Sequence, residues 1–249
     1  MNHRVYYAAE DSDALRFALD YLALSGGRIA TTPTPAVTDV LLGVPCRIAP
    51  EELRNALKDI PNGVRVYGGF LNREELQNHH CYDLLQQEGY LAKNAAITAH
   101  CALQLTAQRL PVTLEGCPAL VIGWGRIGKI LAKLLHATGA DVTVAVRRES
   151  QRAMLEALGY TAIPLPLEEY LLPQFRVIFN TVPAPVLSRR ALSCCRPDCI
   201  KLELASKDGF DGEDILIARG LPGKMAPESS GKLIARTVMR LGNRKEEDL

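Results

Sequence analysis

The sequence predicts an α/β protein of two lobes, each built on a parallel sheet with helices on its faces. Strand-like and helix-like segments alternate along the chain, and this alternation favours parallel pairing. The 249 residues, 47% of them hydrophobic, are enough to bury two cores. An alanine-rich helix, expected from about residue 94 to residue 109, separates two groups of alternating segments.

The first lobe is expected to span residues 1–93. Its strands are expected at residues 5–9, 40–44 and 64–67. A helix follows the first strand, with apolar side chains at helical spacing from Leu15 to Leu22 and an end at Gly26-Gly27. A second helix, residues 50–58, opens with Pro-Glu-Glu, which is typical of a first helical turn.

Three further segments complete the expected organisation. A connecting helix lies within residues 94–112, where Pro111 stops it. Residues 113–231 form the second lobe, and residues 232–249 form a C-terminal helix and a charged tail that is expected to fray.

The second lobe opens with the pattern of a dinucleotide-binding turn. An apolar strand, residues 119–122, leads directly into a glycine-rich stretch that begins a helix. The stretch reads Gly123-Trp124-Gly125-Arg126-Ile127-Gly128 and fits Gly-x-Gly-x-x-Gly. Gly123 permits the tight turn, Gly125 lets a diphosphate approach the backbone, and Gly128 lets the helix lie close to the strand. Because the N–H groups at the helix start can receive phosphates, the sequence predicts a Rossmann fold that binds a nicotinamide dinucleotide.

The end of the next strand, residues 141–146, indicates which coenzyme is bound. Proteins that bind NAD commonly place an acidic residue there, on the ribose 2′-hydroxyl, whereas this chain has Arg147-Arg148-Glu149-Ser150. Arginine would pair with the 2′-phosphate of NADP through charge-assisted hydrogen bonds. We therefore expect NADP rather than NAD, held by Arg147, Arg148 and Ser150. Two alternatives stay open: the arginines are only solvated, or Glu149 reaches the ribose hydroxyls.

Two later strands of the second lobe end in polar loops, where an open α/β sheet meets its ligand. Strand 176–179 leads into Asn180-Thr181-Val182-Pro183, and strand 200–204 leads into Ala205-Ser206-Lys207. We expect these loops near the nicotinamide end of the coenzyme. The alternative is that Asn180 and Ser206 only cap the turns that follow them. A third segment, residues 219–230, contains Lys224 and ends at a helix start, which makes it a candidate carboxylate receptor.

Composition argues against several kinds of partner. The 29 basic and 28 acidic residues leave a net charge of +1, so no general field attracts nucleic acid or acidic membrane. Neither a signal-like segment at the start nor a run of 18 apolar residues occurs, so we expect a cytoplasmic protein. Seven cysteines without an export signal predict reduced, buried and inert thiols. Cys194, Cys195 and Cys199 match no common zinc spacing, and we expect no metal site.

Three blocks of the sequence resemble the A subunit of bacterial dipicolinate synthase. They are residues 123–128, residues 180–184, and residues 204–207 followed by 220–227. The last block, Gly-Leu-Pro-Gly-Lys-x-Ala-Pro before a helix, is the most specific, and the similarity covers about residues 94–238. The resemblance implies NADP-linked oxidation of a dihydrodipicolinate-type cyclic diacid to dipicolinate. It also implies a flavoprotein-like partner, the B subunit of that enzyme, and expression during sporulation; a homo-oligomer is a further expectation.

Three residues are the expected catalytic groups of such a reaction. Lys207 and Lys224 would bind the two carboxylates, with Arg126 as a weaker third cation. His100 would be the base, because it is the histidine near the expected cleft between the lobes and its ordinary pKa of about 6.5 suits that work. The alternative is that His100 is merely packed or exposed on its alanine-rich helix.

Differences from the family pattern keep two other functions open. Residues 97–101 read Ile-Thr-Ala-His-Cys where the family has Pro-Thr-x-Glu-Gly, so His100 replaces a glutamate, and Glu203 replaces an aspartate. One alternative is a non-catalytic NADP-binding subunit. The other is a D-2-hydroxyacid dehydrogenase-like oxidoreductase, which uses a histidine late in the chain, whereas no histidine follows His136 here.

Overall fold

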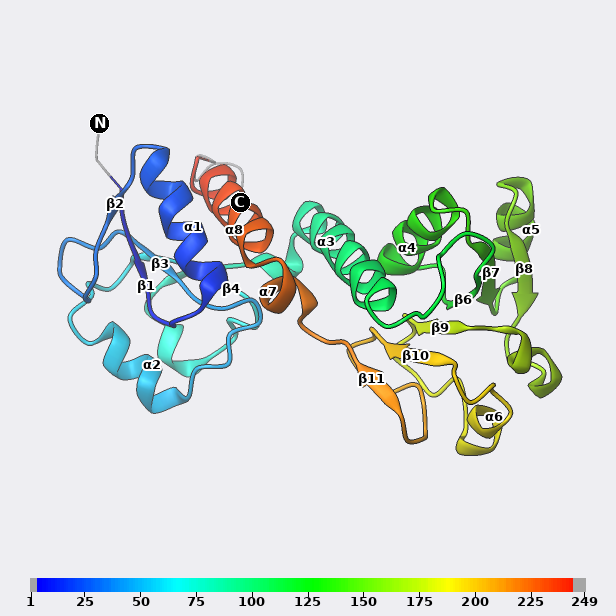
Figure 1. The fold of residues 1–249 in the computed structure, drawn as a ribbon. Coiled ribbons are helices and arrows are strands. Elements are labelled where there is room, and N and C mark those ends of the chain that lie inside the picture. Colours follow the sequence, from blue (N-terminus) through cyan, green and yellow to red (C-terminus); the bar gives the residue numbers. More distant parts are fainter. Residues whose placement is uncertain (1–3, 244–249) are drawn as a thin grey trace. The chain divides into compact units, whose positions relative to one another are not determined.

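The structure is a computed structural model that describes residues 4–243, and the chain forms two compact units (Figure 1). The first consists of the described parts of Met1–Asn94 and Pro222–Leu249, and the second is Ala95–Leu221. Each unit has its own parallel sheet, which confirms the predicted fold class. The expected charged tail, apart from Asn243, lies outside the described residues.

Five parallel strands form the sheet of the first unit, in the order β2-β1-β3-β4-β5. The strands are β1 (Val5–Ala8), β2 (Arg28–Ile29), β3 (Asp39–Leu41), β4 (Arg65–Gly68) and β5 (His80–Asp83). The helices are α1 (Asp13–Leu24), α2 (Pro50–Leu57) and α8 (Pro227–Gly242), with 3-10 turns η1 (Glu74–Leu76) and η2 (Leu84–Gln86). Val40, Leu53 and Val66 belong to one buried cluster that joins β3, α2 and β4.

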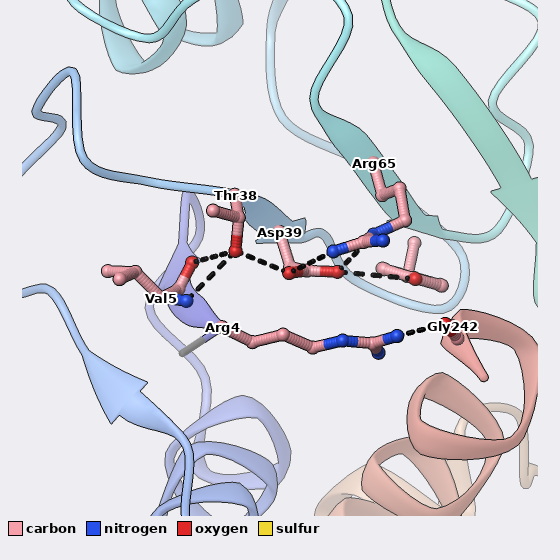
Figure 2. Close-up of polar contacts among 7 residues, drawn as sticks. Arg4, Val5, Thr38, Asp39, Arg65 and Gly242 are labelled. Atoms are coloured by element: carbon pink, nitrogen blue, oxygen red, sulfur yellow. Dashed lines mark hydrogen bonds and ion pairs between the residues drawn. The ribbon is translucent and has the colours of Figure 1, made fainter. Parts of the chain in front are cut away.

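The C-terminal helix α8 belongs to the first unit, where it packs against α1. A Cβ atom on Gly231 would lie 2.5 Å from the carbonyl oxygen of Ala14 and 2.8 Å from the nitrogen of Ala18, so the two helices touch where only glycine fits. At the other end of α8, the Arg4 guanidinium donates a hydrogen bond to the Gly242 carbonyl (Figure 2). The second unit therefore ends at Leu221, earlier than the expected boundary at residue 231.

A buried carboxylate joins β3 and β4 near the amino ends of the first sheet (Figure 2). Asp39 is fully buried and accepts two hydrogen bonds from Arg65, at 2.7 and 2.9 Å. Its oxygens also accept from the Thr38 hydroxyl at 2.6 Å and the Tyr67 hydroxyl at 3.3 Å. Burial, with Asp39 as the next cause, raises the pKa of Tyr67, so this phenol stays a donor. In open α/β sheets, ligands bind at the carboxyl ends of the strands. Because the Asp39 cluster lies at the opposite, amino ends, we interpret it as structural.

Six parallel strands form the sheet of the second unit, in the order β11-β10-β9-β6-β7-β8. They are β6 (Pro118–Ile122), β7 (Asp141–Val146), β8 (Thr161–Pro164), β9 (Val177–Asn180), β10 (Ile200–Glu203) and β11 (Ile215–Ile217). Between them lie α4 (Arg126–Ala137), α5 (Glu149–Ala157), η3 (Glu169–Gln174) and α6 (Arg189–Ser193). The strand order reverses between β6 and β9, which is the Rossmann arrangement.

The two units are linked by two helices of different length. Helix α3 (Glu88–Ala107) begins before the expected residue 94, since the Tyr90 ring is already buried in its first turn, and it ends at Ala107. The short α7 (Leu221–Met225) carries the chain back into the first unit. Within residues 4–243, no helix combines the length and the apolar character that crossing a bilayer requires.

Candidate functional site

The glycine-rich turn between β6 and α4 has the geometry that the sequence predicts. Gly123 has φ +103°, and a Cβ atom there would lie 2.6 Å from the Thr181 Oγ1 atom and 2.7 Å from the Val182 Cγ2 atom. A Cβ atom on Gly128 would lie 2.2 Å from the carbonyl oxygen of Gly123. These two glycines are therefore required by the protein itself, because α4 starts directly against the end of β6.

Gly125 is different, because nothing in the structure lies within 4 Å of the place where its Cβ atom would be. It is the N-cap residue of α4, and no side chain caps this helix. The first turn of α4 thus presents backbone donors and the positive end of the helix dipole beside open space. This cradle fits the diphosphate of a dinucleotide.

Trp124 and Ile127 fill the two half-buried positions of the motif. The Trp124 ring meets the Tyr160 ring edge to face, with centroids 5.7 Å apart, and Tyr160 meets the His136 ring in the same way at 5.6 Å. The indole thereby anchors the turn against the segment before β8. Trp124 can contribute its backbone to a bound diphosphate, while its ring packs on the protein.

The carboxyl end of β7 is basic and exposed. Arg147, Arg148 and Ser150 are all exposed, and no residue in 4–243 forms an ion pair with either arginine. Arg148 is the N-cap residue of α5, and that helix also lacks a side-chain cap. Both guanidinium groups are therefore available to an anion beside the predicted coenzyme site. Glu149, in the first turn of α5, is exposed as well.

Asn180 lies at the end of β9, where its side chain is fully buried. Its Nδ2 atom donates to the Val182 carbonyl at 3.0 Å and to Glu203 Oε1 at 2.8 Å, while its Oδ1 atom accepts from the Val182 nitrogen at 2.9 Å. A Cβ atom on Gly209 would lie 2.1 Å from Asn180 Nδ2. The turn-capping alternative therefore describes the Asn180 side chain, and any contact between Asn180 and a coenzyme has to come from its backbone.

Glu203 is the residue whose role the sequence did not reveal. Its carboxylate is buried and accepts from the Asn180 side chain and from the nitrogens of Ala205 at 3.1 Å, Gly209 at 2.8 Å and Phe210 at 3.3 Å. One side chain thus fixes the loop after β9 and the loop after β10. A buried, fully paired carboxylate of this kind is a positioning group.

The remaining loop residues are divided between buried and exposed positions. Thr181 donates from its hydroxyl to the Ile122 carbonyl at 2.8 Å, which ties the β9 loop to the glycine-rich turn. Val182 is half-buried and Pro183 is exposed; in the other loop Ala205 is buried and Ser206 is exposed. The exposed members of these loops surround the carboxyl ends of β6, β9 and β10.

The three expected catalytic side chains are all exposed. His100 is on α3 and Lys207 is in the loop after β10, within the second unit. Lys224 is in α7, in the part of the chain that returns to the first unit. Their catalytic roles stay predictions.

A cavity of about 740 Å³ lies beside β11 and is lined by Asp208, Asp211, Asp214 and Arg219 among others. The Arg219 guanidinium is already bound, to Asp208 at 2.6 Å and to the Ala205 carbonyl at 2.8 Å. With its cation paired, this acidic cavity disfavours a dicarboxylate. Its contribution to the site is indirect, since Arg219 fastens the Ala205 loop.

The cysteines are free, as expected, but they are not all buried. Cys81 is exposed, and Cys194 and Cys195 are partly exposed. A hydrogen bond with the Cys199 thiol, together with nearby Lys201, lowers the pKa of Cys195 to about 7 against the effect of burial. The expectation of buried thiols is therefore wrong for Cys81, Cys194 and Cys195, and the lowered pKa predicts that Cys195 is reactive near neutral pH. Within residues 4–243, no three metal-ligating side chains gather into a site.

Comparisons with known proteins bear on the identity of this fold. No protein-family model matches the chain. A stretch of 168 residues, 64% of the chain, is 28% identical to the A subunit of dipicolinate synthase of Bacillus subtilis (strain 168) and covers 56% of that protein. Glutamyl-tRNA reductase of Campylobacter concisus (strain 13826) is 32% identical over 110 residues, which are 42% of this chain and 25% of the reductase. The matched part of the chain therefore spans about half of the first relative's length and a quarter of the second's.

Solved structures show the same fold over nearly the whole chain. The A subunit of dipicolinate synthase from Bacillus halodurans matches with a TM-score of 0.82 and 22% identity, over 98% of this chain and 99% of that one. The corresponding chain of dipicolinate synthase from Bacillus subtilis matches with a TM-score of 0.75 and 20% identity, over 97% and 96%. An L-alanine dehydrogenase matches with a TM-score of 0.67 and 12% identity, over 96% and 80%. The resemblance seen in the sequence is confirmed: the chain is similar to the A subunit of dipicolinate synthase in sequence and in fold.

Proposed function

We propose that this chain is an NADP-dependent oxidoreductase that converts a dihydrodipicolinate-type cyclic diacid to dipicolinate. The observation that carries the proposal is the open cradle at Gly125, at the start of an uncapped helix in a Rossmann sheet. The similarity to the A subunit of dipicolinate synthase supports the choice of substrate.

The chain's own residues fit the coenzyme in two places. The first turn of α4 would hold the diphosphate, and Arg147, Arg148 and Ser150 would hold the 2′-phosphate. When bound, the nicotinamide supplies a hydride acceptor. The loops fixed by Glu203 and Thr181 border the carboxyl ends of β9 and β10, next to the turn.

Lys207, Lys224 and His100 would act on the diacid. The two lysines would neutralise its carboxylates and orient the ring, and His100 would accept the proton that leaves as the ring becomes aromatic. Because aromatisation is itself favourable, the protein mainly has to align the substrate. A flavoprotein-like B subunit as partner, assembly into homo-oligomers, a cytoplasmic location and a role in sporulation complete this proposal.

A second candidate is a non-catalytic NADP-binding subunit. Two observations favour it. His100, Lys207 and Lys224 are all exposed. The Glu203 carboxylate is occupied by hydrogen bonds to the loops after β9 and β10, so it is not available to a substrate. A D-2-hydroxyacid dehydrogenase-like reaction is disfavoured, because no histidine follows His136.

The test is to mix the purified chain with NADP and freshly formed dihydrodipicolinate, with and without the B subunit, and to follow the absorbance of the reduced nicotinamide. The proposal predicts NADPH formation by the wild type and a slower rate in His100→Ala at unchanged NADP affinity. If the chain binds NADP but produces no NADPH with or without the B subunit, the result would contradict the proposed reaction and support the non-catalytic NADP-binding subunit.

A further inference from the structure

The loop after β10 is held from inside by the Glu203 carboxylate. Glu203 is the last residue of β10 and is 1% exposed. Its Oε1 atom accepts from the Ala205 nitrogen at 3.1 Å, and its Oε2 atom accepts from the nitrogens of Gly209 at 2.8 Å and Phe210 at 3.3 Å. The loop therefore turns around one buried carboxylate, whose charge strengthens each of these hydrogen bonds.

The same loop is held from outside by the Arg219 guanidinium. Arg219 follows β11 and its side chain is 33% exposed. Its Nε atom donates to the Ala205 carbonyl at 2.8 Å, and its Nη2 atom donates to Asp208 at 2.6 Å. Ala205 is thus bound at its nitrogen by Glu203 and at its carbonyl oxygen by Arg219. These two side chains form a clamp, and the exposed residues 206 and 207 lie on the stretch that it fixes.

The clamp is connected to the glycine-rich turn through the loop after β9. Glu203 Oε1 also accepts from Asn180 Nδ2 at 2.8 Å, and the Asn180 side chain binds the Val182 backbone at both its nitrogen and its carbonyl. The Thr181 hydroxyl donates to the carbonyl of Ile122, the last residue before the turn. One network of hydrogen bonds therefore joins three loops at this edge of the sheet, all within the second unit.

The order of the strands indicates which half of the coenzyme lies at the clamped loop. The glycine-rich turn follows β6, Arg147 and Arg148 follow β7 on one side of it, and β9 and β10 lie on the other side. A dinucleotide with its diphosphate at the turn extends in both directions along this edge. Since the proposed site places the adenosine half and its 2′-phosphate at the end of β7, the nicotinamide half falls to the ends of β9 and β10.

We propose that Glu203 and Arg219 are positioning residues that hold residues 206–207 at the nicotinamide half of the bound coenzyme. The inference rests on the proposed coenzyme site, and neither positioning residue has to touch the coenzyme in this role. A loop that is already fixed in its bound conformation loses less conformational freedom on binding, which raises the affinity for the half that it contacts. The adenosine half, on the other side of the turn, gains nothing from the clamp.

The test compares the affinity of the full chain for NADP and for adenosine 2′,5′-bisphosphate, which keeps the adenosine half and its 2′-phosphate but lacks the nicotinamide. Glu203→Gln removes the charge inside the loop, and Arg219→Gln removes the guanidinium outside it. Because Arg219 is only half-buried, its variant tests the clamp even where Glu203→Gln fails to fold. Arg176→Gln is the matched control, since the Arg176 side chain is 27% exposed and pairs with Asp198 at 2.9 Å, at the opposite, amino end of β9.

We expect Glu203→Gln and Arg219→Gln to lose roughly two- to tenfold in NADP affinity and to bind the bisphosphate as the wild type does. The control should bind both ligands normally. Unchanged NADP affinity in either variant that folds, or an equal loss for both ligands, would overturn the role of the clamp and leave NADP binding by the wild type intact. A wild type that binds neither ligand would overturn the proposed function and this inference together.

Discussion

Gly125 and Gly128 belong to one motif but are glycine for different physical reasons. A Cβ atom on Gly128 would collide with the Gly123 carbonyl, whereas one on Gly125 would meet only open space. Gly128 is required by the fold, and Gly125 leaves room for a ligand.

This difference predicts opposite outcomes for two matched substitutions. Gly128→Ala should lower the free energy of unfolding by about 1–3 kcal/mol, since either β6 or α4 has to move. Gly125→Ala should leave the stability of the free protein unchanged and weaken NADP binding by about tenfold or more, because its methyl group occupies the diphosphate space. Denaturant unfolding and calorimetric titration of both variants check this. Normal NADP affinity in a well-folded Gly125→Ala protein would contradict it.

The arginines after β7 should determine the preference between coenzymes. Arg147→Gln is expected to weaken NADP binding by roughly ten- to hundredfold, because a hydrogen bond between charged groups contributes about 1.5–3 kcal/mol. The affinity for NAD, which lacks the 2′-phosphate, should stay the same. Arg152→Gln, in the following helix, removes the same charge and serves as the control. A parallel loss for NAD and NADP would show that Arg147 does not read the 2′-phosphate.

Cys195 should react with alkylating reagents at lower pH than an ordinary cysteine, whose pKa is about 8.5. The pKa of Cys195 is lowered to about 7, so its reactive thiolate should appear as the pH rises through that value. In Cys199→Ala the midpoint should move up, because the hydrogen-bond donor that stabilises the thiolate has been removed. Mass spectrometry of iodoacetamide-treated protein at several pH values measures both. A labelling midpoint of Cys195 at the ordinary value of about 8.5 or above would be inconsistent with this lowered pKa.

At the residue scale, the sequence predicts positions better than side-chain directions. The glycine motif and the basic end of β7 can be recognised because each has a fixed spacing from a strand. Asn180 and Glu203 follow or end strands as expected, yet their side chains point inward to each other. The two side chains point inward because the backbone nitrogens of the neighbouring loops lie there and donate hydrogen bonds to them. The spacing of residues along the sequence does not show where those nitrogens lie.

At the element scale, the four strands that the sequence does not reveal are the four edges of the two sheets. They are β2, β5, β8 and β11. None of these four strands contains a buried residue, so a hydrophobic run is not required in them. The strands are also short: β2 has two residues, and β11 has an apolar run of only three, Ile-Leu-Ile. The central strands, buried from both sides, carry the apolar runs that make them recognisable.

The Asp39 cluster gives a prediction for the elements that it joins. Asp39→Asn should lower the free energy of unfolding by about 3 kcal/mol, because it leaves the Arg65 charge without its partner. Replacing both residues, Asp39→Asn with Arg65→Met, should recover part of that loss. Chemical denaturation of the single and double variants measures the coupling. A single variant as stable as the wild type would show that the ion pair contributes nothing to the fold.

At the scale of the whole molecule, the order of segments along the chain misleads in one respect. Helix α8 follows the Rossmann unit in sequence but completes the first unit, where Gly231 lies against α1. Apolar periodicity shows that a helix has a buried face, but it does not show which distant helix covers that face. The two sheets and the Rossmann strand order, which depend on local alternation, are predictable.

The central claim is that the turn at residues 123–128 binds a nicotinamide dinucleotide, and calorimetric titration of the full chain with NADP tests it most directly. The account predicts saturable heat for one site and, at a hundredfold excess over Kd, about 2.7 kcal/mol of added stability seen as a higher Tm. Neither heat nor thermal protection at millimolar NADP and NAD would contradict it.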